Sequence, residues 1–184
     1  MAILKVARMG HPILRSKAVP VPANQIASAS IQRLIDDMFE TMREYSGIGL
    51  AAPQVHHGVR IFVAGVREGI VGDAITEDAD MPLIALINPE ITPVDETVES
   101  SWEGCLSIPD IRGLVPRPAL VRVQAYSRNG ERLTFTASGL PGRVIQHEND
   151  HLDGVLFFDR MSSLSSLTYL DEYRRYWTET EDDE

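Results

Sequence analysis

The order of secondary-structure signals along the 184-residue chain predicts an α+β fold, in which antiparallel β-sheets pack around a central helix that carries an H-E-x-x-H pattern. Three observations support this fold class. Apolar residues at helical spacing mark an N-terminal helix, short strand-like stretches cluster between residues 59 and 126, and helical patterns return after residue 139. Because no helices separate the strands, antiparallel sheets are favoured over alternating βαβ units.

The first helix is predicted over residues 29–45, where apolar residues recur at the i, i+3, i+4, i+7 spacing of one helical face. Ser28 or Ser30 can cap its start, and Gly47 supplies a stop. Residues 12–24 contain three prolines and are expected to be extended and irregular. The apolar face of the helix consists of Ile31, Leu34, Ile35, Met38, Phe39 and Met42.

Strands are expected in the middle of the chain. Residues 59–65 and 83–88 are short apolar runs, whereas residues 92–100 and 120–126 alternate more nearly with period two. The segment 127–131 contains an Asn-Gly pair, which indicates a hairpin because both residues tolerate positive φ.

Two helical stretches follow the strands. Residues 139–152 are predicted to form a helix with Pro141 near its first turn, where the missing N–H costs nothing. A C-terminal helix is predicted over residues 163–177. We expect one domain over residues 1–178 and a disordered acidic tail over residues 179–184. One side of the C-terminal helix would carry Tyr169, Leu170, Tyr173, Tyr176 and Trp177.

Composition excludes several classes of protein. The length is that of one domain of roughly 100 to 200 residues, so a monomer is the default expectation. With 27 acidic and 17 basic residues the net charge is −10, which disfavours binding to DNA. The single cysteine rules out an internal disulfide. No apolar run approaches the roughly 18 residues of a membrane span, and no signal peptide is evident, so we expect a cytoplasmic protein without membrane contact.

The sharpest local feature is the H-E-x-x-H pattern formed by His147, Glu148 and His151. Histidines four residues apart lie on one face of a helix, so both imidazoles can reach one metal ion. Glu148 can then bind a water on that ion and act as general base. An ordinary amphipathic helix would favour leucine or isoleucine at the two histidine positions, because buried polar groups need partners.

A catalytic zinc-type site has three protein ligands, and three sources for the third were considered. The metzincin pattern would require a histidine where the chain has Phe157. Asp171 and Glu172 lie in a helix where solvated charges are expected. Cys105 precedes an Ile-Pro pair expected to break a strand and expose the thiol, and thiolates bind zinc and ferrous iron strongly. We therefore prefer Cys105.

Two other interpretations of Cys105 stay open on the residues alone. It could be a buried structural thiol, because free cysteine often lies in a protein core. It could also be a nucleophile with His147 or His151 as its base. The nucleophile leaves the second histidine and Glu148 unexplained, whereas a metal site accounts for all four residues.

Three segments together resemble, in order and spacing, the signature motifs of the peptide deformylases. They are GIGLAAPQ at 47–54, EGCLS at 103–107 and QHENDH at 146–151. The segments 11–21 and 112–117 are also similar to that family, so the resemblance extends over about residues 5–160.

The resemblance implies a hydrolase that removes the N-formyl group from the initiator N-formylmethionine of nascent polypeptides. It implies a metal bound by Cys105, His147 and His151, usually Fe²⁺, with Zn²⁺, Ni²⁺ or Co²⁺ able to occupy the site. Glu148 would be the general base and acid.

The same resemblance assigns the remaining site residues. Gln54 and the backbone N–H of Leu106 would stabilise the oxyanion, although a solvated glutamine and an ordinary strand amide are the plainer interpretations. Ile48 and Gly49 would contact the substrate as an added strand. Arg112 would hold peptide carbonyls or a carboxylate.

A methionine pocket and an ion pair complete the expected site. Leu140 and Ile145 would contribute to an apolar pocket for the methionine side chain. Glu103 and Arg117 are matched charges in the motif regions and are expected to pair.

The sequence departs from the resemblance at its C-terminal end, and two rival functions stay open. Some family members dock on the ribosome through a basic terminal helix, whereas this chain ends in acidic residues, so docking through its tail is doubtful. One rival is a gluzincin-like endopeptidase with Asp171 or Glu172 as third ligand. The other is a binding module that keeps the fold without catalysis.

Overall fold

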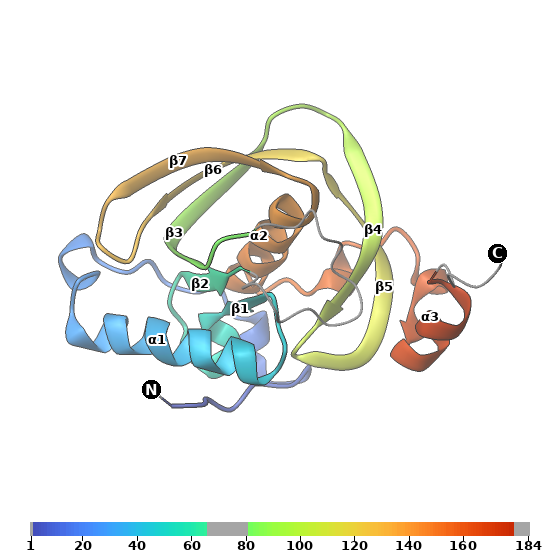
Figure 1. Cartoon of the computed structure of the whole chain (residues 1–184), viewed down its shortest axis with the longest axis horizontal. Coiled ribbons are helices and arrows are strands. Elements are labelled where there is room, and N and C mark those ends of the chain that lie inside the picture. The colour runs from blue at the N-terminus through green and yellow to red at the C-terminus, as the bar shows by residue number, and fades with distance from the viewer. Residues whose placement is uncertain (1, 66–80, 179–184) are drawn as a thin grey trace.

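The computed structural model describes residues 2–65 and 81–178, and it confirms the predicted α+β class. A five-stranded sheet and a three-stranded sheet lie on either side of helix α2 (Gly139–Leu152), as Figure 1 shows. The bounds of α2 are those predicted from the sequence. In the described part of the chain, no helix is long and apolar enough to cross a membrane.

Two short 3₁₀ helices, Pro12–Arg15 and Ala23–Gln25, lie at the two ends of the segment 12–24, so the prediction of extended backbone is wrong there. Helix α1 follows over Ala29–Glu44, within one residue of the prediction. The side chain of Ser28 accepts a hydrogen bond from the N–H of Ile31, so Ser28 is the cap. The helix buries Leu34, Ile35, Met38, Thr41 and Met42.

The larger sheet has the strand order β1-β2-β3-β6-β7, and every pairing in it is antiparallel. The hairpin expected at the Asn-Gly pair connects its last two strands, with Gly130 at φ 81°. Strand β6 has the bounds that the alternation predicted. The strands are β1 (Gly49–Ala51), β2 (Ile61–Ala64), β3 (Ile84–Pro93), β6 (Leu120–Tyr126) and β7 (Arg132–Ser138).

Both faces of this sheet are covered around β2. Ile61 and Val63 pack with the buried residues of α1, whereas Phe62 and Ala64 pack with those of α2. A strand buried on both faces has no polar side, which explains why residues 61–64 form an uninterrupted apolar run.

The smaller sheet has the order β4-β5-β8, with β4 (Val98–Cys105), β5 (Ile108–Pro118) and β8 (Thr168–Tyr169). The single strand predicted over residues 92–100 was wrong. Strand β3 ends at Pro93, the carboxylate of Asp95 accepts the N–H of Thr97 in a tight turn, and β4 then starts a different sheet.

The prediction that the Ile-Pro pair after Cys105 breaks the strand was also wrong. Cys105 pairs with Ile108 across a two-residue turn, so Ile108 and Pro109 begin β5 instead. The register shifts between Glu103 and Cys105, and residues 109–112 have no Cα partner in β4. Proline fits there because no ladder hydrogen bond to β4 depends on its missing N–H.

The predicted C-terminal helix is shorter than expected. Helix α3 covers only Leu170–Tyr176, and the first half of the predicted stretch forms a 3₁₀ turn (Leu164–Ser166) and β8. Pairing with β5 competes with the helix here, because Ile111 and Arg112 bind the backbone of β8. The expected apolar side packs only in part: Trp102 contacts Tyr173 and Trp177, with ring centroids 5.0 and 5.4 Å apart. The predicted acidic tail, residues 179–184, lies outside the described residues.

Candidate metal centre

The smaller sheet and α2 bring together three side chains that can bind a metal ion. His147 and His151 lie one turn apart on α2, and Cys105 is the last residue of β4. One ligand atom from each lies within 4.8 Å of the others, and Cys105 Sγ is 3.2 Å from His151 Nε2. The sequence prediction of a Cys-His-His group is therefore confirmed as a geometry that can hold a metal ion.

The donor set fits a divalent metal with soft-to-borderline character. Burial by itself raises the pKa of the Cys105 thiol, but His151 and His147 beside the sulfur lower this pKa well below its usual range. The thiolate is the form that binds metal. Within the described residues, the buried Nδ1 of His151 and Oε2 of Glu148 have no hydrogen-bond partner.

The alternative carboxylate ligands lie elsewhere. Asp171 is exposed on α3, and Glu172 on the same helix is 3.6 Å from Arg175. Neither belongs to the group around Cys105. The geometry therefore gives no support to the gluzincin-like ligand set.

Glu103 orients the first histidine. Its Oε2 lies 2.9 Å from His147 Nδ1, and because an ionised carboxylate only accepts, His147 donates from Nδ1. This leaves Nε2 of His147 as the nitrogen available to a metal. Burial favours the neutral acid, but hydrogen bonds from His147 and Arg117 outweigh it and hold the pKa of Glu103 well below its usual range.

The predicted ion pair between Glu103 and Arg117 is confirmed. Arg117 donates from Nε and Nη2 to the two carboxylate oxygens of Glu103, over 2.6 and 2.9 Å. Both side chains are buried. Arg143 adds a third donor to Glu103 over 2.8 Å. A buried carboxylate with this many charged donors is fixed in place.

Glu148 lies beside the three ligand residues and is 4% exposed. Burial is the main cause that raises its pKa, to about 7. Gly49 in β1 packs directly on this carboxylate, because a Cβ added at Gly49 would lie 2.3 Å from Oε1 and 2.7 Å from the carboxyl carbon. The close approach, rather than an unusual backbone angle, is what requires glycine at this position.

The Gly49→Ala variant should therefore lower kcat about a hundredfold while the metal stays bound. The added methyl must displace the Glu148 carboxylate, and a misplacement of about 1 Å at a reacting group costs on the order of 100-fold. Gly58→Ala is the matched control, because a Cβ there meets nothing within 4 Å. Steady-state kinetics and metal analysis of both variants test this; equal kcat values for the two would contradict the role of the contact.

Gln54 is buried, at 1% exposure, so the interpretation as a solvated glutamine is wrong. Its Oε1 accepts the N–H of Ala51 over 2.7 Å, and its Nε2 lies 3.6 Å from Cys105 Sγ and 3.3 Å from Ser107 Oγ. The amide group is therefore oriented with its donor side toward the ligand sulfur. Leu106 follows Cys105 in the two-residue turn.

The residues expected to bind substrate are distributed around this centre. Ile48 precedes β1 and packs partly buried against the core. Arg112 covers Gly104, where an added Cβ would lie 2.1 Å from the guanidinium, and burial lowers the pKa of Arg112. Ile145 lies in the core at 2% exposure.

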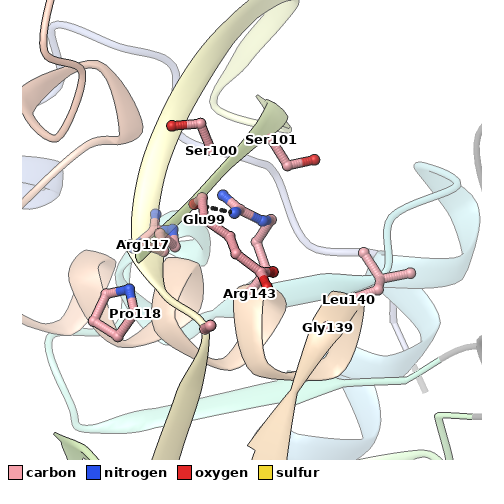
Figure 2. Close-up of a pocket in the computed structure, with 9 residues that line it drawn as sticks. Glu99, Ser100, Ser101, Arg117, Pro118, Gly139, Leu140 and Arg143 are labelled. Atoms are coloured by element: carbon pink, nitrogen blue, oxygen red, sulfur yellow. Dashed lines mark hydrogen bonds between the residues drawn. The ribbon is translucent and has the colours of Figure 1, made fainter. Parts of the chain in front are cut away.

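A cavity of about 200 Å³ lies between β4, the end of β5 and the start of α2 (Figure 2). Leu140 lines this cavity, whereas Ile145 lies in the core and is not among the lining residues. Arg143 crosses one wall and donates to the carbonyl of Glu99 over 2.9 Å. The lining residues are Glu99, Ser100, Ser101, Arg117, Pro118, Ala119, Gly139, Leu140 and Arg143.

Sequence reasoning missed the charged residues behind the ligands. Arg143 and Asp150 lie on α2, and Arg160 follows it; all three belong to one ion-pair network with Glu103 and Arg117. A signal was present, because α2 is predicted to be central yet carries charges at positions 143 and 150 that a buried helix must pair.

These features define a class of protein. A helix with H-E-x-x-H, a thiolate as third ligand and a buried glutamate beside them are the parts of a metal-dependent hydrolase.

Comparison with known proteins then shows the family. The family model described as polypeptide deformylase matches residues 3–166, and the chain belongs to this family. "Peptide deformylase 2" of Pseudomonas putida is 40% identical over 167 residues, 91% of this chain and 92% of that protein. "Peptide deformylase 2" of Nostoc sp. is 39% identical over 176 residues, 96% of each chain.

Solved structures agree. The Met-Ala-Ser-bound crystal structure of class I type b peptide deformylase from Acinetobacter baumannii matches with a TM-score of 0.82 and 38% identity. The match covers 87% of this chain and 99% of that one. Peptide deformylase from Thermotoga maritima matches with a TM-score of 0.77 and 37% identity, over 89% of this chain and all of that one.

Proposed function

We propose that this protein removes the formyl group from the initiator N-formylmethionine of nascent polypeptides, with one divalent metal held by Cys105, His147 and His151. The observation that carries the proposal is the buried Cys-His-His group with the carboxylate of Glu148 beside it and no hydrogen-bond partner for its Oε2 within the described residues. Membership of the deformylase family gives the reaction.

We take Fe²⁺ as the native metal, with Zn²⁺, Ni²⁺ or Co²⁺ able to replace it. Imidazole and thiolate ligands suit all four ions, so the metal that occupies the site in the cell depends on metal availability as well as on geometry. When bound, the metal supplies a Lewis acid that activates water and polarises the formyl carbonyl of an otherwise unreactive amide.

Glu148 transfers a proton from the attacking water to the leaving amine. Its Oε2 is free of other partners in the described structure, so it can accept the proton of the attacking water and pass it to the amine that leaves. A pKa raised to about 7 by burial suits a group that must both take and release a proton near neutral pH.

Gln54 and Leu106 would stabilise the charge that develops on the formyl oxygen. The side-chain amide of Gln54 is fixed at its Oε1 by Ala51, so its Nε2 donors are held toward the ligand group at no further cost in ordering. The N–H of Leu106 would add a backbone donor from the turn after Cys105.

The Gln54→Leu variant should lower kcat about a hundredfold at full metal occupancy, because one preorganised oxyanion donor is removed. Ser107→Ala is the control: it removes the other partner of the amide but keeps its Nε2 donors. Initial rates on a formylated peptide, normalised to bound metal, provide the measurement. An unchanged kcat in metal-loaded Gln54→Leu would exclude the oxyanion role.

Two sheet edges give the substrate a place to bind. Among the described strands, β1 pairs only with β2 and β4 only with β5, so each has one edge without a strand. Gly49 of β1 packs on Glu148, and Leu106 after β4 lies next to Gly47. An extended peptide can add as a strand here and read few side chains, with main-chain contacts to Ile48 and Gly49.

The remaining substrate contacts follow from this placement. Arg112, which covers Gly104 in β4, would hold peptide carbonyls or a carboxylate further along the peptide. Leu140 would contact the methionine side chain from the cavity at the start of α2, and Ile145 would support that wall from the core.

We further propose that residues 1–178 form one catalytic domain that works as a monomer in the cytoplasm. The net charge of −10 supports the absence of DNA binding. The acidic residues of the tail, 179–184, would repel ribosomal RNA, so we do not expect that segment to anchor the protein on the ribosome.

The test of the function is formate release from formyl-Met-Ala-Ser by ferrous protein prepared without oxygen. Anaerobic handling matters because both Fe²⁺ and a thiolate ligand oxidise. We expect equimolar formate and free methionyl peptide, and no reaction with acetyl-Met-Ala-Ser. Cleavage of internal peptide bonds without formate would instead indicate an endopeptidase, and metal-bound protein without any turnover would indicate a binding module.

A further inference from the structure

A continuous series of charged side chains extends from the first histidine to the protein surface. His147 donates to Glu103, Glu103 accepts from Arg117, Arg117 donates to Asp150, and Asp150 accepts from Arg160. The first four groups are buried, whereas the side chain of Arg160 is 50% exposed.

Arg117 is shared between two carboxylates. Its Nε and Nη2 bind Glu103, and its Nη1 binds Asp150 Oδ2 over 2.9 Å. A guanidinium is a rigid planar group, so a displacement of Nη1 also moves Nε and Nη2, the two nitrogens that bind Glu103. The position of Glu103, and with it the orientation of His147, therefore depends on how Asp150 is satisfied.

Arg160 donates most of the hydrogen bonds that the carboxylate of Asp150 accepts. It donates from Nη2 to Oδ1 over 2.6 Å and from Nε to Oδ2 over 3.2 Å. The side chain of Asp150 is only 7% exposed, so without Arg160 its Oδ1 would lack its donor in a place that water reaches poorly. Asp150 would then draw Arg117 away from Glu103.

We propose that Arg160 is a positioning residue for the metal centre, which holds His147 in its ligand orientation through Asp150, Arg117 and Glu103. The inference rests on the proposed metal site and adds a half-exposed residue whose side-chain hydrogen bonds, in the described part of the chain, go to Asp150. The proposal applies to His147 and not to His151, because His151 Nδ1 has no hydrogen-bond partner among the described residues.

A neighbouring ion pair provides the matched control. Arg15 pairs with Asp159, the residue before Arg160, and its side chain is 47% exposed. Its other hydrogen bond, 3.5 Å long, goes to the carbonyl of Gly154. Arg15→Gln thus removes a half-exposed arginine next to the same segment and leaves Asp150 and its partners intact.

The experiment measures Co²⁺ affinity of the full-length metal-free protein by competition with a chelator, together with the visible spectrum of the Co²⁺ form. Loss of partners beyond the ligands typically weakens metal binding 10- to 100-fold, so we expect Arg160→Gln to bind Co²⁺ about tenfold more weakly. Its spectrum should shift as the His147 bond changes. Arg160→Lys, which keeps the charge, should recover part of the affinity, and Arg15→Gln should match the wild type.

The inference is overturned if Arg160→Gln keeps wild-type affinity and spectrum, or if Arg15→Gln weakens Co²⁺ binding equally. Thermal unfolding of Arg160→Gln and Arg15→Gln identifies a merely structural effect. Such an effect would lower the thermal stability of both variants and leave the Co²⁺ spectrum unchanged. A wild-type protein that binds Co²⁺ and releases formate while Arg160→Gln is normal contradicts this inference alone. A wild-type protein that binds no Co²⁺ contradicts the proposed function as well.

Discussion

Replacing Glu148 with glutamine should lower kcat for deformylation about a thousandfold while the protein keeps one metal ion per chain. Glutamine has nearly the shape of glutamate but cannot accept a proton, and general acid–base catalysis contributes roughly 10²- to 10⁴-fold. Because Glu148 is not in the Cys-His-His group, its replacement leaves all three proposed ligands in place. Kinetics with a formylated peptide and elemental analysis of the same sample provide the measurement.

Glu172→Gln is the control for this experiment, because it removes a carboxylate from α3 that lies outside the proposed site. It should leave both kcat and metal content unchanged. A Glu148→Gln protein with near-normal kcat would show that another group moves the proton. A Glu148→Gln protein without metal would show that Glu148 acts as a ligand.

Cys105→Ala should lose the metal and, with it, all metal-dependent turnover. The variant removes the only thiolate of the chain from a three-ligand site. Loss of a ligand should weaken metal binding by more than about a hundredfold, which is the upper end of the cost of losing a partner beyond the ligands. His147→Ala and His151→Ala should behave in the same way. The metal that remains bound after gel filtration in a buffer that contains a chelator measures the effect.

The two outcomes that would contradict this ligand set are distinct. Full metal content and activity in Cys105→Ala would exclude the thiolate as ligand. Metal loss in Glu172→Ala, with Cys105→Ala unaffected, would favour the endopeptidase ligand set. The position of Glu172 next to Arg175 on α3 argues against that result.

The local parts of the fold could be predicted from sequence because each rests on a local physical rule. Helix α2 begins and ends where the pattern placed it, and α1 is off by one residue at its C-terminal end. The strand over residues 120–126 follows from alternation alone, because one face of β6 is polar and the other is buried. These elements can be predicted without knowing which other elements they pack against.

The errors arose where a distant partner decides the structure. Alternation over residues 92–100 continues across a turn, so it cannot show that the two halves belong to different sheets. Pro109 is tolerated in β5 because the β-bulge removes the need for its N–H. Residues 168–169 pair with β5 instead of extending α3.

The site residues likewise fall into those that a local pattern predicts and those that depend on distant partners. The spacing of His147 and His151 is local and could be predicted, whereas Cys105 was selected by elimination and by resemblance. The network that ends at Arg160 joins residues as far apart as positions 103 and 160, so the charges on α2 indicate that partners are needed but not which residues supply them. Only the folded chain shows which buried charges compensate one another.

The most direct test of the account is a titration of metal-free wild-type protein with Fe²⁺ under anaerobic conditions, with formate release from formyl-Met-Ala-Ser measured at each addition. We expect no activity before metal is added, a linear rise, and a plateau at one equivalent per chain. Formate release by the metal-free protein, or no release after one equivalent is bound, would contradict the assignment of a metal-dependent deformylase.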